Sequence, residues 1–336
     1  MATTDNKVLV LGATGGFGGE TARQLRDHGW QVQALQRGLK NAMEVREGIV
    51  YFRGDALNRD DVMQAAKGCS VIVHAVNPPG YRRWSEWVLP MIDNTIAAAL
   101  AENATIVLPG TVYNYGPDAF PLLREDAAQH PQTRKGRIRV ELEQRLRDAS
   151  TRGAQAIVLR AGDFFGQQTS NTWFAQGLIK PGQAIKTINL PGVRGVGHQW
   201  SYLPDAAQTI VQLLDRRASL PPFSSFHMAG HWDADGTQMA AAIARCVEQD
   251  GGQAKQRPFA WWLVRLASPF VPTLREMLEM RYLWQQPLRM DNSGLLAVLG
   301  TEPHTPLEQA VKATLEGLGC LSRRSMTLQP IRTKKN

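Results

Sequence analysis

The chain has 336 residues, 43% of them hydrophobic and 20% charged, with a formal net charge of +8. This composition is ordinary for a globular protein, and no apolar run approaches the roughly 20 residues that a membrane-spanning helix needs. The first predicted strand begins by about residue 7, so we expect no signal peptide. The three cysteines, Cys69, Cys246 and Cys320, are far apart, so we expect no disulfide framework, no metal site and a cytoplasmic protein.

A glycine-rich turn follows the first predicted strand, residues 7–11, and precedes a helical stretch at 20–28. Gly12 permits a tight turn, Gly15 lets the backbone approach a pyrophosphate, and Gly18 lets the helix pack closely on the strand. A helix start also offers N–H groups to phosphates. This context predicts dinucleotide binding rather than a turn without a ligand, and the residues expected to take part are Gly12, Thr14, Gly15, Gly16, Phe17 and Gly18.

Strands and helices then alternate. We expect strands at 31–35, 49–52, 71–75, 105–108 and 156–159, and helices at 60–67, 84–103 and 137–151. The alternation predicts an α/β fold, a Rossmann-type doubly wound parallel sheet. Ligands bind beyond the carboxyl ends of such strands. We therefore expect one cleft lined by the residues that follow these ends, which are Gly12, Arg37, Asp55, Asn77, Thr111 and Asp163, with Ala56 and Ala75 among the cofactor contacts.

The residue that closes the second strand indicates the cofactor. An NAD site usually has Asp or Glu there, whereas this chain has Gln36 and Arg37. A guanidinium can grip a 2′-phosphate, so Arg37 favours NADP, with NAD as the alternative. Arg37 can also be read as a solvated loop residue. Asp55 can bond the adenine amino group or can cap the following helix.

The second half of the chain is less regular. Residues 164–197 are rich in Gly and Pro, and we expect helices at 205–215 and 237–248 and a strand at 223–228. The expected division is a dinucleotide-binding domain at 1–165, with core elements also drawn from about 198–230. A smaller C-terminal substrate lobe then comprises 166–197 and 231–322. The basic tail at 323–336 is expected to be flexible and solvated rather than a nucleic-acid or membrane patch.

Several motifs occur together in one order: the Gly12–Gly18 turn, Gly54-Asp55, Val112-Tyr113, the segment 159–166, and Tyr202-Leu203-Pro204-Asp205. With them, residues 7–245 resemble an extended short-chain dehydrogenase/reductase of the NAD-dependent epimerase/dehydratase type. The resemblance implies a catalytic Ser or Thr and a Tyr-x-x-x-Lys pair followed by Glu four residues later.

The chain departs from that catalytic pattern. The serine position falls on Pro109, which leaves Thr111 as the nearby hydroxyl. Anchoring the helix motif on Glu141 places Arg137 at the lysine and Thr133 at the tyrosine. A threonine is too weak an acid to replace a phenol. Arg137 stays charged and is expected to bind the cofactor ribose, but it cannot donate its proton usefully, so the usual pair is expected to be missing. Lys135 lies two residues early and is expected to point elsewhere.

Other side chains are candidates for catalysis or substrate contact. Tyr113 follows the fifth strand and can replace the missing acid, alternatively serving only in packing. The expected substrate contacts are Tyr115, Asp163, His198 and Tyr202. His74 is expected to be a hydrogen-bonded core residue.

Two functions fit these features. One is an NADP-dependent oxidoreductase or epimerase/dehydratase that acts on a small polar metabolite, such as a nucleotide sugar or a carbonyl compound. The other is a non-catalytic NAD(P)-binding redox sensor or regulator, since fold alone does not decide function. Neither requires nucleic acid or a membrane, and a homodimer is compatible with both.

Overall fold

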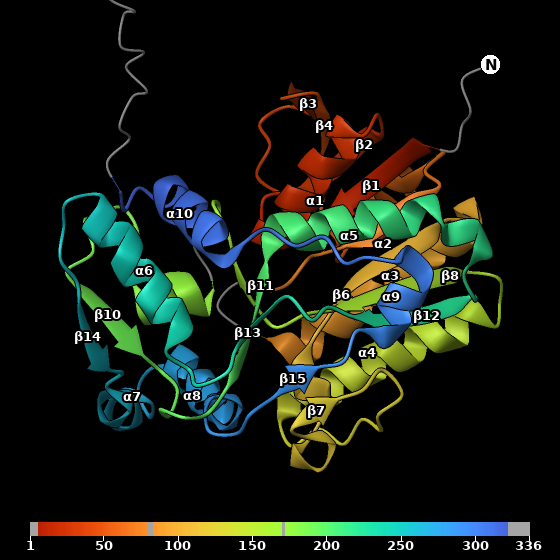
Figure 1. Ribbon diagram of the computed structural model, residues 1–336. Helices are drawn as coiled ribbons and strands as arrows, with labels where there is room; N and C mark the ends of the chain where they lie inside the picture. The colour runs from red at the N-terminus through yellow and green to blue at the C-terminus, as the bar shows by residue number, and fades with distance from the viewer. Residues whose placement is uncertain (1–5, 79–82, 170–171, 322–336) are drawn as a thin grey trace, which may run out of the picture.

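An eight-stranded sheet organises the larger part of the computed structural model (Figure 1), which describes residues 6–78, 83–169 and 172–321. The strands are parallel except β3, which runs antiparallel to β4 at one edge. Their spatial order is β12 (Phe223–His227), β8 (Gln155–Arg160), β6 (Thr105–Gly110), β5 (Val71–His74), β1 (Lys7–Leu11), β2 (Gln31–Gln36), β4 (Ile49–Arg53), β3 (Met43–Arg46). The order reverses direction at β1, so a crevice opens beyond the end of this strand.

Helices cover both faces of this sheet. One face carries α1 (Gly16–Asp27), α5 (Leu203–Asp215) and α9 (Ser293–Leu299); the other carries α2 (Arg59–Ala66), α3 (Trp84–Glu102) and α4 (Arg134–Ser150). Each face of the sheet has its own hydrophobic core, and alternate residues of β1 pack in one or the other. Val8 and Val10 pack on the side of α1 and α5, and Leu9 and Leu11 pack on the side of α3. A strand buried on both faces reads as a continuous apolar run, which explains the pattern at 7–11.

A smaller lobe has its own core, which includes Phe165, Phe174, Ile243 and Val311. One sheet contains β9 (Asp163–Phe165), β11 (His198–Tyr202) and β13 (His231–Asp233), and β10 (Thr187–Leu190) pairs with β14 (Lys255–Pro258). Its helices are α6 (Gln238–Gln249), α7 (Trp261–Ala267), α8 (Pro272–Glu279) and α10 (Leu307–Gly317). They lie together beside the large sheet (Figure 1).

Several short elements lie between the main helices and strands. The strands β7 (Leu122–Leu123) and β15 (Arg289–Met290) pair in parallel. Single turns of 3-10 helix lie at Val112–Asn114, Pro117–Ala119, Arg217–Ser219 and Arg281–Trp284, and a π-helical turn lies at Phe174–Leu178.

The predicted α/β fold with a doubly wound parallel sheet is confirmed, and every predicted strand and helix is present within a few residues. Three details differ. The edge strand β3 was not predicted, and α4 begins at Arg134 rather than at 137. The helix α9, expected in the substrate lobe, packs on α5 and β12 of the larger part. The proposed basic tail at 323–336 lies outside the described residues.

Of the helices in the described parts of the chain, none combines the length and apolar character that crossing a membrane needs. Within the same residues, no three His, Cys, Asp or Glu side chains are grouped so that they can hold a metal ion. The three cysteines are buried and unpaired with one another.

Candidate active site

The turn between β1 and α1 is shaped by two of its glycines. Gly12 has φ +89°, and a Cβ there would lie 2.5 Å from the carbonyl oxygen of Ala75. A Cβ on Gly18 would lie 2.8 Å from the carbonyl carbon of Gly12. A Cβ on Gly15 would meet only the Gly12 carbonyl oxygen, in a tight contact at 3.3 Å. No side chain caps α1 at Gly15. An uncapped helix start fits a phosphate.

A cleft of about 820 Å³ runs along the carboxyl edge of the large sheet. Its size lies in the usual range for small-molecule sites. All six residues that the strand ends predicted to lie together line it: Gly12, Arg37, Asp55, Asn77, Thr111 and Asp163. Thr14, Gly15, Gly16, Phe17, Ala56 and Ala75 line it too, whereas Gly18 packs beneath the turn.

Arg37 and Asp55 lie at one end of the cleft. The Arg37 side chain is 59% exposed, and its Nη1 lies 3.9 Å from Oδ2 of Asp55. The other Asp55 oxygen accepts a hydrogen bond from the backbone N–H of Leu57 at 3.0 Å. Asn58, not Asp55, caps α2, accepting from the N–H groups of its first turn. Asp55 therefore stays available on the cleft wall.

A buried polar network holds the loop after β6. The Thr111 hydroxyl donates to Oδ1 of Asn114 at 2.5 Å, and its carbonyl accepts from Nη1 of Arg160 at 2.6 Å. Asn114 and Arg160 both bond the Glu143 carboxylate, at 2.8 Å and at 3.0 Å. Burial alone would raise the pKa of the Glu143 carboxyl, but the Arg160 guanidinium and the other donors hold it below its ordinary value. The network fixes Thr111 at the cleft floor.

The structure places the catalytic candidates of α4 differently from the expectation built on Glu141. Thr133 caps the helix, accepting from the N–H of Gly136 at 2.9 Å, and Arg137 is exposed; neither lines the cleft. Glu141 is also exposed and pairs with Arg145.

Lys135 and Arg139 line the cleft instead, and Glu143 follows one turn later in the buried network. Residues four apart share one helix face, so 135, 139 and 143 point inward while 137 and 141 point to solvent. The motif register is therefore shifted by two residues from the one that Glu141 suggested. Lys135, Arg139 and Glu143 have the four-residue spacing of the expected pattern.

Lys135 and Arg139 are both sequestered from solvent. Lys135 is 5% exposed, and its Nζ lies 2.7 Å from Oε2 of Glu276 on α8. Burial lowers the pKa of Lys135, and the Glu276 carboxylate opposes that shift. Nη2 of Arg139 donates to Oδ1 of Asn77 at 3.4 Å, while its buried Nε has no hydrogen-bond partner among the described protein atoms. An unpaired buried donor beside a cleft is costly unless a ligand accepts from it.

The tyrosine candidates separate clearly. Tyr113 lines the cleft, with its ring 6.5 Å from that of Trp84. Tyr115 and Tyr202 do not line it. Tyr115 is buried under the Arg160 guanidinium, which lies 5.0 Å from its ring, and burial raises the pKa of its phenol. Burial raises the pKa of Tyr202 to about 12, and its ring packs on Phe165. Both are placed as packing residues.

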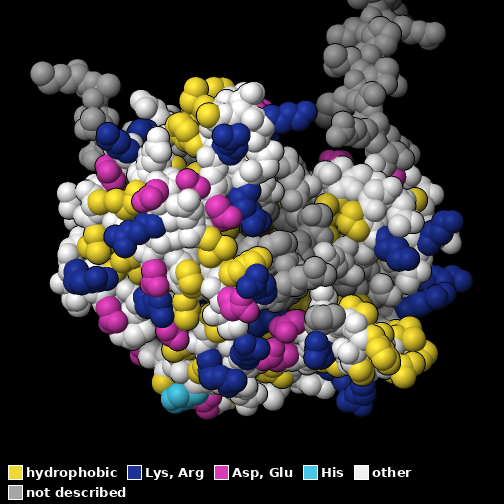
Figure 2. Space-filling view, turned by 180° about the vertical axis from the view of Figure 1, so that it is seen from behind, with side chains coloured by type: hydrophobic (Ala, Val, Ile, Leu, Met, Phe, Trp, Pro, Cys, Tyr) yellow, Lys and Arg dark blue, Asp and Glu magenta, His cyan; other side chains and the backbone are white. Residues whose placement is uncertain are grey.

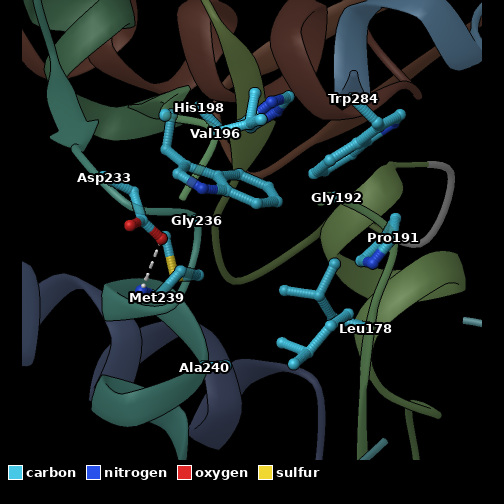
Figure 3. Close-up of a pocket in the computed structure, with 13 residues that line it drawn as sticks. Leu178, Pro191, Gly192, Val196, His198, Asp233, Gly236, Met239, Ala240 and Trp284 are labelled. Carbon is cyan, nitrogen blue, oxygen red and sulfur yellow. Dashed lines mark hydrogen bonds between the residues drawn. The ribbon is translucent and has the colours of Figure 1, made fainter. Parts of the chain in front are cut away.

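Asp163 and His198 form a pair on two adjacent strands of the smaller lobe, β9 and β11. Nε2 of His198 lies 2.8 Å from Oδ2 of Asp163, and its ring stacks on Trp284 at 3.8 Å. His198 faces a separate cavity of about 20 Å³, drawn in Figure 3, which has room for about one water. His198 does not line the large cleft itself but contacts Asp163, which does. His74 bonds Thr95 in the core, and burial lowers its pKa to about 3.

The remaining cleft wall contains an apolar group of side chains and the polar residues Gln168, Thr169 and Thr172. Trp87 and Met91 of α3 face Trp173, Met280 and Leu283 from the smaller lobe and its connections. Trp173, Met280 and Leu283 were missed from the sequence because they come from short or irregular segments without a motif, and Trp87 and Met91 because no motif marks which side of α3 meets the cleft. The spacing of Lys135, Arg139 and Glu143 was a usable signal, since it repeats every four residues.

Comparisons with known proteins agree with this geometry. The family model described as "NAD dependent epimerase/dehydratase family" matches residues 8–229. Similar solved structures include MoeE5 in complex with UDP-glucose and NAD (TM-score 0.70, 18% identity, covering 93% of this chain and 98% of that one). A putative epimerase from Burkholderia cenocepacia has TM-score 0.71 and 16% identity, covering 94% and 98% of the two chains.

A curated relative, sterol-4-alpha-carboxylate 3-dehydrogenase, decarboxylating, from Mus musculus, is 31% identical over 77 residues. That match spans 22% of this chain and 20% of the mouse protein.

Proposed function

Because this chain belongs to the NAD-dependent epimerase/dehydratase family of enzymes, we propose that it uses NADP to oxidise or reduce a hydroxyl or carbonyl group of a small substrate. In this proposal Lys135 exchanges the proton that accompanies hydride transfer. The supporting observation is the pair Lys135 and Arg139, two buried cations that face the cleft beside Thr111 and Tyr113. Bound nicotinamide supplies the hydride chemistry, and the chain supplies binding, orientation and the proton.

The turn at Gly12–Gly18 holds the phosphates in this proposal, and Arg37 binds the 2′-phosphate. The guanidinium of Arg37 has N–H donors available for the phosphate, because its contact with Asp55 is long, 3.9 Å, and lies at the cleft surface. A charge-assisted hydrogen bond to the phosphate contributes about 1.5–3 kcal/mol, or roughly tenfold or more in affinity. Asp55 accepts from the adenine amino group.

Lys135 suits proton transfer because a desolvated ammonium gives up its proton more readily than one in water. Thr111, held by the Arg160 and Glu143 network, orients the reacting oxygen. Arg139 has an unpaired buried Nε and binds the cofactor ribose. Tyr113 is the second candidate for the proton, since it lines the same cleft.

The substrate is proposed to have an apolar body next to its reacting group. Trp87, Trp173 and Leu283 offer apolar contact area for that body, and Gln168, Thr169 and Thr172 of the same lining offer hydrogen bonds to its polar groups. A nucleotide sugar, as bound by MoeE5, and a sterol acid, as named for the mouse relative, mark the two ends of the range to be screened.

Cofactor choice is tested by calorimetric titration with NADPH and NADH. We expect NADPH to bind at least about tenfold more tightly, and Arg37→Asp to reverse the order. The control is Arg53→Ala, an exposed arginine outside the cleft, which should change neither affinity. Equal affinities in the unmodified protein would contradict the NADP assignment.

The proton donor is tested by hydride transfer with a panel of alcohols and carbonyl compounds. Lys135→Met should reduce turnover by about 10²–10⁴-fold while NADPH affinity is retained. Arg139→Met should weaken NADPH binding, and Arg137→Met, on the exposed side of the same helix, should do neither. Full turnover by Lys135→Met would move the role to Tyr113. Tight cofactor binding without turnover of any substrate would favour the redox sensor.

A further inference from the structure

The smaller lobe exposes a cluster of large hydrophobic side chains, which we call the α7 patch. It comprises Trp262, Leu263 and Leu266 on α7 and Phe270 and Val271 just after it. Trp262 is 68% exposed and Phe270 is 86% exposed. Among the described residues these are five of the ten large hydrophobic side chains that are exposed. Figure 2 shows hydrophobic side chains gathered at this lower corner of the molecule. A concentrated apolar patch marks a surface that contacts something.

The helix α7 is fixed on one side and presents the other. Val264 is buried, and Trp261 donates from its indole N–H to the carbonyl of Pro191 at 2.8 Å. The Trp261 ring also lies 5.9 Å from that of Trp173, which lines the cleft. Residues 262, 263 and 266 share the opposite side, since three or four residues make one turn. Because one side of α7 packs on the smaller lobe, its other, apolar side faces solvent.

The sequence around the α7 patch is mainly basic, and the carboxylates of the adjoining α8, Glu276 and Glu279, bond Lys135 and the backbone N–H of Arg134. Between residues 251 and 275 the chain has four basic residues and no acidic one. They are Lys255, Arg257, Arg265 and Arg275, and all four are exposed. Trp, Phe and Leu on one side with Lys and Arg around them is the composition of helices that lie in the interface of an anionic membrane.

We infer that the α7 patch docks on the surface of an anionic lipid membrane. Trp262, Leu266 and Phe270 enter the headgroup boundary, and the surrounding basic side chains attract the acidic lipids. A symmetric dimer through the same patch would bring these like charges together, which disfavours self-association there. On the anchored side of the same helix, Trp261 packs on Trp173 of the cleft wall, so α7 lies between the docked surface and the cleft. The inference goes beyond the proposed function and does not need catalysis.

The test is cosedimentation of the full-length protein with vesicles of phosphatidylcholine alone or mixed with phosphatidylglycerol. We expect binding to the mixed vesicles that weakens as salt is added and is much weaker to phosphatidylcholine alone. The double substitution Trp262→Ser and Phe270→Ser should reduce binding at least about tenfold, because it removes two interfacial anchors. Both side chains are exposed, so the melting temperature should not change.

Matched variants make the test specific. Met43→Ser with Val45→Ser removes two exposed hydrophobic side chains from β3, far from the α7 patch in the fold, and should leave binding unchanged. Arg257→Gln with Arg265→Gln should weaken binding several-fold and reduce its salt dependence. The tail from 322 is the same in every variant, so a difference between them reports the patch.

Failure to bind mixed vesicles, or equal binding by the Trp262 and Phe270 variant, would overturn the inference. Sedimentation velocity gives an independent check. A self-association that the same double substitution abolishes would also overturn it, by assigning the patch to a second copy of the chain. Loss of turnover without loss of vesicle binding would contradict the proposed function and leave the docking surface supported.

Discussion

Gly15 and Gly18 lie three residues apart in one turn, and the structure predicts different effects of substituting them. Substitution of Gly15 should weaken cofactor binding, and substitution of Gly18 should lower stability. At Gly15 the backbone has φ −91° and ψ 170°, a region that valine readily adopts. Its Cβ would meet only the Gly12 carbonyl oxygen, at 3.3 Å. We therefore expect Gly15→Val to fold with a nearly unchanged melting temperature. Its branched side chain then fills the space above the start of α1.

The expected loss is in cofactor affinity. Phosphates pushed away from the helix start lose one or two charge-assisted hydrogen bonds, each of about 1.5–3 kcal/mol. This corresponds to NADPH binding that is weaker by roughly 10-fold to more than 100-fold.

Gly18→Ala is the matched control because its added methyl points the other way. The Cβ would lie 2.8 Å from the carbonyl carbon of Gly12 and 3.1 Å from Cβ of Ala75. Such overpacking costs about 1–3 kcal/mol, and each kcal/mol lowers the melting temperature by about 2–4 °C. Calorimetry with NADPH and thermal unfolding followed by circular dichroism measure both variants. Unchanged affinity in Gly15→Val, or unchanged unfolding in Gly18→Ala, would refute this reading of the turn.

Three further outcomes are expected. Glu143→Gln leaves the buried Arg160 guanidinium without its counter-charge and should lower the free energy of unfolding in urea by about 3–5 kcal/mol. The control, Glu141→Gln on the exposed side, should lower it by less than about 0.5 kcal/mol, and similar losses from both would contradict the burial difference. Thr133→Ala removes a helix cap and should lower the free energy of unfolding by about 1 kcal/mol with little change in turnover, and Thr133→Ser should retain that stability. A large loss of turnover in Thr133→Ala would show that Thr133 takes part in catalysis. Burial lowers the pKa of His74 and of His227 to about 3, below the roughly 6.5 of the unfolded chain, so the unfolded state binds more protons between these values. Stability should be full above about pH 6.5 and should fall toward pH 3, by up to about 1.4 kcal/mol per pH unit for each histidine; a melting temperature that is flat across this interval would show that the histidines are not buried neutral.

The strand ends were predictable because a parallel sheet brings them to one edge. Arg37, Asp55 and Thr111 are far apart in the sequence, yet topology alone places them in one cleft. The apolar runs of the central strands identified the sheet for the same reason, since both of its faces are buried. The edge strand β3 has an exposed surface and lacks that run, so its sequence carried no comparable signal.

The register of α4 was not predictable from one sequence. Glu141 and Glu143 are both compatible with a helix, and only burial distinguishes the one that binds Arg160 from the one that pairs with Arg145. The expectation built on Glu141 selected residues on the solvent side, two positions after the residues that line the cleft. The apolar part of the wall could not be predicted for another reason. Met280 and Leu283 reach the cleft from turns, where no hydrophobic periodicity indicates which side chains are buried.

The two ends of the cleft are built by independent means, and this has a consequence for engineering. The dinucleotide end consists of strand termini fixed by the hydrogen-bonded ladder of one sheet. Trp173, Met280 and Leu283 come from segments outside that sheet, and Trp173 and Leu283 pack on two other clusters of buried residues. Residues of the second group can therefore be randomised in a library while the sheet keeps its register and its cofactor. New substrate preferences are then selectable on a constant redox scaffold.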